Sequence, residues 1–292
     1  MRRLFLVLIL AIIGLALPQR ADAWGFEVHK FIVARAIPLL PPEIRPFFEK
    51  YRVTIVEHAV DPDLWRTAGW LEEPPRHFVD MDAYGAFPFK ELPHEYDQAV
   101  ARYGKAFVDK NGTLPWRTEE IQKKLVEAFR QKGWYDRENI KFFSSIIAHY
   151  TADAHVPFHA ALNYDGQLSG QWGIHSRFES ELFERYQAQL TIAPRPPFAI
   201  ANPREFIFDT LSASFPLVQP MLDADKAAVA GRDAYDNQYF TMFFSKAKPV
   251  LERRLSEAIT GVASMVTSAW VEAGRPPLPL EVVNPPRKVR KQ

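Results

Sequence analysis

The chain has 292 residues, of which 47% are hydrophobic and 24% charged, with a formal net charge of +1. This balance gives no global argument for electrostatic nucleic-acid binding, which usually shows a basic patch or a high pI. The length allows one large domain or two small ones. Because the sequence contains no cysteine, packing and bound metal, rather than disulfides, must hold an exported form of the chain.

Residues 1–23 are typical of a secretory signal peptide. A basic start precedes a short apolar run, Leu4 to Leu17, and residues 21–23 (ADA) supply small side chains for cleavage. The run is shorter than the about 20 apolar residues of a membrane span, although an uncleaved anchor is the alternative. We therefore expect a secreted or periplasmic protein whose mature chain begins at Trp24.

Helical periodicity dominates the rest of the chain and predicts an all-α fold, a single multi-helix domain over residues 24–275. No alternating strand pairs with hairpin turns are evident. The expected helices are Val28–Leu39, Thr118–Gln131, which begins with a cap-like Arg117-Thr118 pair, Asn139–Ala154, Ser176–Leu190 and Lys246–Ala273.

Three long loops rich in Pro and Gly separate these helices, and long irregular loops in compact domains are often functional. They are Glu73–Pro93, Leu162–Gly173 and Ile192–Pro203. Residues 276–292 form a Pro-rich tail with a basic end, which we expect to be disordered. Docking of the tail on anionic surfaces is the alternative.

The densest group of chemically active residues is HYTADAHVPFH, residues 149–159. His149 and Asp153 are four residues apart, so they project from one helical face. Pro157 ends the helix, and His159 can turn back toward the same point. His155 lies about 240° around the helix from His149 and faces elsewhere. The alternative, a polar helix end, is weakened by the apolar neighbours, since buried His and Asp need partners.

Five further candidates lie outside this stretch. His175 and Glu179 repeat the four-residue spacing at a helix start, although a surface ion pair is the default reading of such a pair. Asp63 could equally be a turn or N-cap residue, His77 lies in a Pro-flanked loop, and His29 follows the processed terminus. Nitrogen and oxygen ligands without cysteine suit zinc and are compatible with manganese or other divalent ions. Their number exceeds one tetrahedral zinc site and predicts a multinuclear centre.

With these motifs the chain resembles the superfamily of trinuclear zinc phosphodiesterases, which joins bacterial zinc-dependent phospholipases C to single-strand-specific zinc nucleases. The family pattern His-x-x-x-Asp-x-x-x-Pro-x-His matches residues 149–159, and the family's mature chains begin with a tryptophan whose amine and carbonyl bind zinc. Nine positions match in order, namely Trp24, His29, Asp63, His77, His149, Asp153, His159, His175 and Glu179.

The resemblance implies a zinc-binding cleft with three zinc ions. One ion would be held by Asp63, His77, His149 and Asp153, and a second by Trp24, His29 and the bridging Asp153. A third, more open ion would be held by His159, His175 and Glu179. The implied activity is phosphodiester hydrolysis by a zinc-bound water, whose pKa the metal lowers toward neutrality.

The substrate implied by the resemblance is divided between phospholipid and single-stranded nucleic acid. Glu179, Glu27 and the absence of cysteine resemble the phospholipases, whereas His29 and Arg66 resemble the nucleases. The candidate catalytic residues are Asp63, Arg66 and Glu27. For Arg66 and for Glu27, a surface ion pair is the alternative.

The loop aromatics could serve either substrate, or simply pack the loop; they are Phe78, Tyr84, Phe87 and Phe89. Exposed rings on which bases can stack would favour single-stranded nucleic acid as the substrate. An exposed apolar rim would instead favour a lipid substrate. We expect a phospholipase C-like enzyme, with a nuclease/3'-nucleotidase as the close alternative and a non-catalytic zinc-holding protein as the third.

Overall fold

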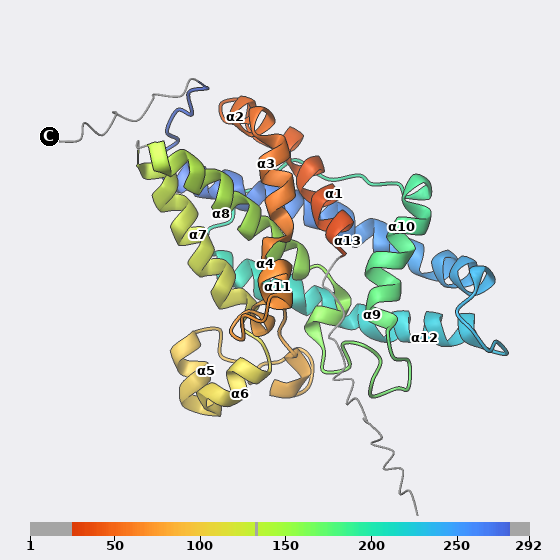
Figure 1. Cartoon of the computed structure of the whole chain (residues 1–292). Coiled ribbons are helices and arrows are strands. Elements are labelled where there is room, and N and C mark those ends of the chain that lie inside the picture. Colours follow the sequence, from red (N-terminus) through yellow and green to blue (C-terminus); the bar gives the residue numbers. More distant parts are fainter. Residues whose placement is uncertain (1–24, 132–133, 281–292) are drawn as a thin grey trace, which may run out of the picture.

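The computed structural model describes residues 25–131 and 134–280 (Figure 1). The described residues form helices and no strands, so the protein is an all-α, single-domain protein, as expected. Its α-helices are α1 Phe26–Ala36, α2 Arg45–Lys50, α3 Arg52–Glu57, α4 Asp61–Thr67, α5 Tyr96–Tyr103, α6 Lys105–Lys110, α7 Leu114–Arg130, α8 Trp134–Asp153, α9 Ile174–Ser176, α10 Leu182–Tyr186, α11 Pro203–Ser214, α12 Val218–Val229 and α13 Asn237–Glu272. None of these helices combines the length and the apolar composition needed to cross a bilayer.

Helix α13 is the central helix of the fold and packs against α1, α7, α8 and α12 (Figure 1). Its apolar side chains recur at helical spacing and are fully buried, for example Leu251, Leu255, Ala258 and Ile259. Burying such side chains stabilises the fold by about 1.5–3 kcal/mol each. Helix α8 lies between α7 and α13, and this packing brings its C-terminal end into the interior of the domain.

The predicted helices all form, but several begin earlier than their apolar periodicity indicates. Helix α7 begins at Leu114 because Pro115, in its first turn, has a backbone angle suited to a helix start. Thr118 was therefore wrongly placed at the start of the helix. It lies inside α7 and donates its hydroxyl hydrogen bond to the carbonyl of Leu114, at 2.8 Å. Helix α13 begins at Asn237, where the Asp236 carboxylate accepts the backbone N–H of Tyr239 at 2.7 Å.

The three loops differ in structure. Loop 73–93 contains two 3₁₀ turns, Pro74–His77 and Met81–Tyr84, and a further 3₁₀ turn, Pro157–Ala160, follows α8. Loop 162–173 carries no helix. Residues 190–202 run extended beside α13 before α11 begins.

The predicted signal peptide, Trp24 and residues 281–292 of the tail lie outside the described residues. The described part of the tail, residues 276–280, accepts hydrogen bonds from the rest of the domain through its backbone carbonyls. The indole N–H of Trp270 donates to Pro276 at 2.9 Å, and Lys50 donates to Leu280 at 2.5 Å.

Candidate metal centre

The C-terminal end of α8 carries the first two candidate ligands, His149 and Asp153, both fully buried. Nδ1 of His149 donates to the carbonyl of Ala59 at 2.8 Å. This bond fixes the imidazole ring and leaves Nε2 as the atom available to a metal, as is usual for ligating histidines. Nε2 lies 3.3 Å from the Asp153 carboxylate. The four-residue spacing thus places two ligand atoms together, as the sequence predicts.

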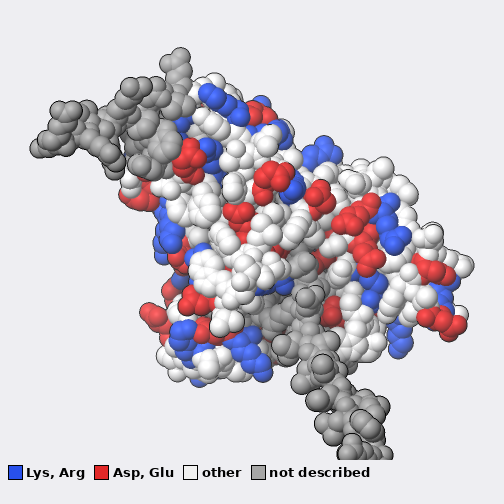
Figure 2. Space-filling view, viewed as in Figure 1, with Lys and Arg blue, Asp and Glu red and all other residues white. Residues whose placement is uncertain are grey.

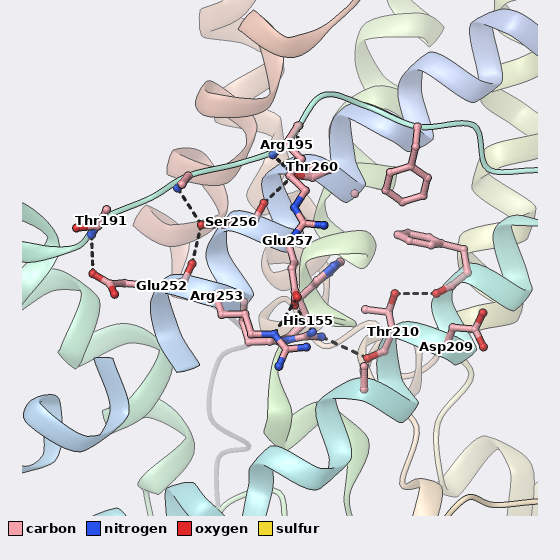
Figure 3. Close-up of a pocket in the computed structure, with 16 residues that line it drawn as sticks. His155, Thr191, Arg195, Asp209, Thr210, Glu252, Arg253, Ser256, Glu257 and Thr260 are labelled. Atoms are coloured by element: carbon pink, nitrogen blue, oxygen red, sulfur yellow. Dashed lines mark hydrogen bonds and ion pairs between the residues drawn. The ribbon is translucent and has the colours of Figure 1, made fainter. Parts of the chain in front are cut away.

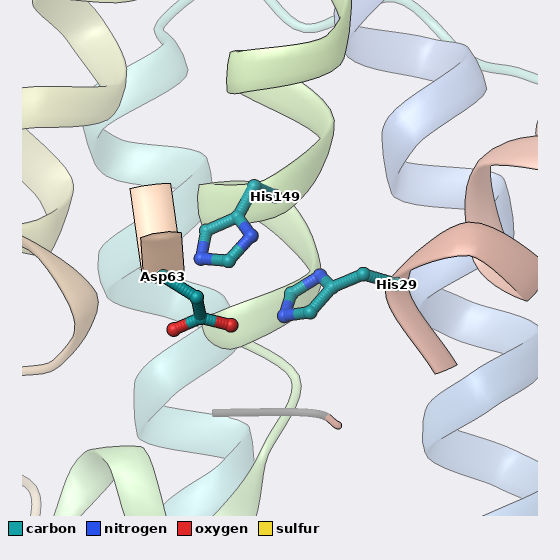
Figure 4. Close-up of side chains that lie close together, drawn as sticks. All are labelled: His29, Asp63 and His149. Atoms are coloured by element: carbon teal, nitrogen blue, oxygen red, sulfur yellow. The ribbon is translucent and has the colours of Figure 1, made fainter. Parts of the chain in front are cut away.

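His29 from α1 and Asp63 from α4 complete one face of this group (Figure 4). The rings of His29 and His149 stack with centroids 3.9 Å apart, and one ligand atom from each of His29, Asp63 and His149 lies within 4.8 Å of the others. Nε2 of His29 is 3.4 Å from Asp153. Among the described residues, neither ring nitrogen of His29 and neither oxygen of Asp63 has a hydrogen-bond partner. Burying such polar atoms without a partner is costly, which indicates a site built for a ligand.

His77 joins the group from the 3₁₀ turn Pro74–His77. Its Nδ1 lies 3.0 Å from Asp153 and 3.1 Å from Nε2 of His149, and these three residues form a second group of potential ligands. Nε2 of His77 points the other way and lies 3.6 Å from the buried carboxylate of Glu73. A carboxylate behind a histidine orients the ring and raises its basicity toward a metal.

Glu73 is a buried carboxylate beside a candidate ligand, and the sequence analysis missed it. The hydroxyl of Tyr150 donates to it, and Arg76 donates to its other oxygen at 2.7 Å. Burial alone would raise the pKa of Glu73, but its bonds with His77, Tyr150 and Arg76 lower it to about 2. The four-residue spacing between Glu73 and His77, the same as in the other two pairs, was the available signal.

A third group of potential ligands consists of His159, His175 and Glu179, one ligand atom of each lying within 4.8 Å of the others. Nδ1 of His159 donates to the carbonyl of His77 at 2.6 Å, and Nε2 of His175 is 3.1 Å from Glu179. Both His175 and Glu179 are buried, so the surface ion-pair alternative is wrong. Glu179 lies in a single π-helical turn, Arg177–Glu181, a deviation frequent at functional sites.

The centre concentrates negative charge in the interior. Burial lowers the basicity of His77, but its bonds to Asp153 and Glu73 outweigh burial and raise its pKa to about 9. Burial would also raise the pKa of Asp153, yet the neighbouring histidines hold it well below its usual range. By contrast, burial lowers the pKa of His29 to about 4 and that of His159 to about 3. Together with the neighbouring carboxylates, these imidazoles could bind a metal ion.

The donor set fits metal ions. Nitrogen and oxygen donors without sulfur suit zinc and other divalent ions, and the buried His and Asp groups could bind them. The grouping differs in one respect from the arrangement implied by the resemblance, because Asp63 lies within ligand distance of His29 as well as of His149. Since Trp24 lies outside the described residues, its predicted role as a backbone ligand is not visible. Gly25, the next residue, donates to Ser180 at 3.1 Å, so α1 begins beside the π-helical turn.

The two candidate catalytic residues beside the ligands differ in environment. Arg66 is largely buried, and its guanidinium lies 3.4 Å from Asp63. Glu27 is exposed and lies 3.9 Å from Lys30, which matches its surface ion-pair alternative. Glu27 also lines a cavity of about 420 Å³ with Ser180 and with Glu184 of α10.

The remaining sequence candidates lie away from the centre. His155 lies two residues beyond the end of α8 and belongs to none of the three ligand groups, and its Nδ1 donates to the carbonyl of Thr151 at 2.7 Å. Of the loop aromatics, Tyr84 and Phe89 are buried and pack the loop, whereas Phe87 is exposed.

No protein-family model matches the chain, and no curated protein matches its sequence.

Proposed function

We propose that the protein is an exported zinc-dependent phosphodiester hydrolase of the phospholipase C type. The observation that carries this proposal is the contiguous set of three buried ligand groups, of which two share His149 and the third approaches them where His159 lies near Asp153. Asp153 lies 3.4 Å from His29, 3.0 Å from His77 and 3.9 Å from His159. A bridging carboxylate between closely spaced cations accounts for this position.

In this proposal the chain holds three zinc ions. His159, His175 and Glu179 would hold one of them, and the other two would be held by His29, Asp63, His77, His149 and Asp153, with the amine and carbonyl of Trp24. Bound zinc would supply an activated water and a positive field for the phosphate oxygens. The carboxylates of Asp63, Asp153 and Glu179 are all buried, and they would offset half of the formal charge of three dications.

The protein's own residues would orient the substrate. The guanidinium of Arg66 lies at the edge of the ligand cluster, where it can donate to a phosphate oxygen beside Asp63. Glu73 would keep the ring of His77 in its ligating orientation. No protein nucleophile is needed, because the attacking group in this class is water.

Exposed apolar side chains favour a lipid substrate. Large apolar residues stand close in sequence to three of the ligands: Phe26 near His29, Leu64 beside Asp63, and Trp172 near His175; all three are at least 36% exposed. Trp70, Leu71 and Leu168 are also exposed. Apolar surface of this kind marks interaction sites, and tryptophan is suited to a lipid–water interface.

A single-strand nuclease is the second candidate, favoured by Arg66 and by two exposed indoles, Trp70 and Trp172, on which bases could stack. On the face shown in Figure 2, however, Lys and Arg alternate with Asp and Glu, and the described residues there form no continuous basic track. Nucleic-acid channels usually have such a track, so lipid is the better supported substrate.

The proposal is tested on protein exported and processed by a host cell. About three zinc ions per chain are expected by elemental analysis, with hydrolysis of phosphatidylcholine faster than that of single-stranded DNA. The opposite preference would assign the nuclease, and metal without turnover of either substrate would leave a zinc-holding protein. One ion or none would contradict the trinuclear centre.

The proposed role of Trp24 has its own control. Protein made with one extra residue before Trp24 carries an amide nitrogen where the amine should be, and it should contain less zinc and lose activity. Removal of the extra residue followed by zinc addition should restore both. Equal metal content and activity in the two forms would show that the terminus is not a ligand.

A further inference from the structure

A cavity of about 520 Å³ is lined by none of the candidate metal ligands (Figure 3). His155 forms part of its lining. Its walls are the facing sides of α11 and α13, and its cover is the extended segment 191–198. The volume is typical of sites for small molecules, which combine apolar walls with a few placed polar groups.

One side of the cavity is rich in guanidinium groups, from Arg195, Arg253 and Arg254. Arg253 and Arg254 share a single carboxylate, that of Glu257, with donor–acceptor distances of 2.9 and 2.5 Å. Among the described residues, the Arg195 side chain makes no hydrogen bond or ion pair, and Figure 3 shows it reaching from the cover toward the cavity. Near this end of the cavity, the three arginine side chains are therefore paired with only one carboxylate, that of Glu257.

Arg254 belongs to the protein's own framework. It is 2% exposed and donates to the carbonyl of His155 at 2.8 Å and to Ser214 at 2.6 Å. Burial lowers its pKa to about 10, so its charge persists at neutral pH. Its positive field acts at the base of the cavity, while Arg195 and Arg253 remain accessible for direct contact.

The other side of the cavity is aromatic. The rings of Phe198, from the cover, and Phe206, from α11, meet edge to face with centroids 5.8 Å apart. Phe198 is 48% exposed, so an apolar ligand would remove surface of this ring from water. Asp209 also lines the cavity, but in Figure 3 it lies beyond Thr210, on the side away from Arg195.

The cover is held rigidly along α13 by side chains four residues apart. The backbone N–H groups of four cover residues, and of Ile200 just beyond the cover, donate in order to Glu252, Ser256, Thr260, Ser264 and Ser268, at 2.6 to 3.0 Å. Two residues of extended chain rise about 6.6 Å and four residues of helix about 6 Å, so the two repeats stay nearly in step, with one step of three residues from Arg195 to Phe198. Arg195 and Phe198 are anchored by two of these bonds, which presets the cationic and aromatic sides of the cavity.

We propose that this cavity is a second binding site, for an amphipathic anion with an apolar body and one carboxylate or phosphate group. The anionic group would lie against Arg195 and Arg253, and the apolar body against Phe198 and Phe206. The site shares no ligand residue with the metal centre, so the proposal does not depend on the proposed hydrolase activity.

Octanoate is a suitable probe, because it combines a carboxylate with a short apolar chain. Calorimetric titration of the zinc-loaded full chain should show saturable binding, and the uncharged octanamide and the short acetate should each bind at least about tenfold more weakly. Arg195→Gln should weaken octanoate binding about tenfold, the scale of one charge-assisted hydrogen bond. Arg130→Gln, a change of another exposed arginine outside the cavity, should leave binding unchanged.

Two further variants locate the bound probe. Ala213 lines the cavity and is exposed, so Ala213→Trp should fill the cavity without disturbing the core and should abolish binding. Asp209→Asn should leave the affinity unchanged or increase it, because a repelling charge is removed. Octanoate that bound equally well to the Ala213→Trp variant would be bound elsewhere, for example at the metal ions, and would overturn the proposal. Weaker binding by Asp209→Asn, or no saturable binding at all, would also overturn it.

Discussion

The domain buries two charged clusters that differ in how their charges are satisfied. In the first, Arg177 and Asp225 form an ion pair, with the two nitrogens Nε and Nη2 lying 3.3 and 3.0 Å from one Asp225 oxygen. Tyr239 donates to that oxygen, and Gln171 donates to the other at 2.7 Å. Arg177 also donates to the carbonyl of Trp172 at 2.7 Å.

In the second cluster, the candidate metal centre, several ligand atoms make no hydrogen bond, although Arg66 lies 3.4 Å from Asp63. The oxygens of Asp63 and one oxygen of Asp153 are buried without a hydrogen bond among the described residues. The two clusters are neighbours along the chain, because Arg177 lies between His175 and Glu179. The first cluster is thus satisfied within the protein, whereas the second leaves polar atoms that a metal ion could bind, since buried charge is normally paired or coordinates metal.

Asp153→Asn should have the largest effect, since it removes negative charge from the point where the ligand groups meet. We expect loss of bound zinc and of hydrolysis together. The melting temperature of wild-type protein should fall on chelation, whereas that of the variant should hardly change. A variant that kept its zinc and near-normal activity would contradict the bridging role of Asp153.

Asp225→Asn should show the converse behaviour. Removing one partner of a buried ion pair costs about 3–5 kcal/mol, so the free energy of unfolding in urea should fall by that amount. The fall should be the same in zinc-loaded and chelated protein, and the folded variant should still gain stability from zinc. If the variant instead lost its zinc while staying as stable as wild type when chelated, the pair would serve the metal centre and the contrast would disappear.

Arg66→Ala tests the catalytic side of the centre. Loss of one electrostatic donor to the phosphate should lower turnover by roughly ten- to a thousandfold, with zinc content unchanged. Steady-state kinetics and elemental analysis on the same preparation check this. A parallel loss of zinc would make Arg66 a structural partner of Asp63.

Glu73→Gln tests the carboxylate behind His77. The substitution keeps the shape and removes the charge, and changes of this kind weaken metal binding about 10–100-fold. Competition with a chelator of known affinity measures the effect. Unchanged affinity would show that Glu73 supports only Tyr150 and Arg76.

Glu27→Gln should have the smallest effect. Because Glu27 is exposed, the free energy of unfolding should change by less than about 0.5 kcal/mol, and zinc should be retained. If Glu27 contacts the lipid headgroup, hydrolysis of phosphatidylcholine should fall by up to about tenfold and more than that of single-stranded DNA. Equal rates for wild type and variant on both substrates would leave Glu27 as a surface ion-pair residue.

The sequence by itself determined the helical class and the local geometry of the ligand pairs. An α-helix repeats every 3.6 residues, so His149 and Asp153 must share a face and His155 must point elsewhere, whatever surrounds them. Pro157 likewise indicates a helix break; helix α8 ends at Asp153, and the 3₁₀ turn that begins at Pro157 returns His159 toward Asp153. These features depend on neighbours in the chain, and periodicity is enough to predict them.

Only the tertiary structure decided which side chains meet across the chain. The contacts of His29 with His149, of Tyr150 with Glu73 and of Arg177 with Asp225 join residues from different elements, and no local spacing encodes such a distance. The same holds for the cover of the second cavity. Its N–H groups are satisfied by hydroxyls and one carboxylate of α13, which becomes evident only once the extended segment lies beside that helix. Burial then decides the chemistry, because the same carboxylate is an ordinary ion-pair partner in water and requires a cation or a hydrogen-bond donor in the interior.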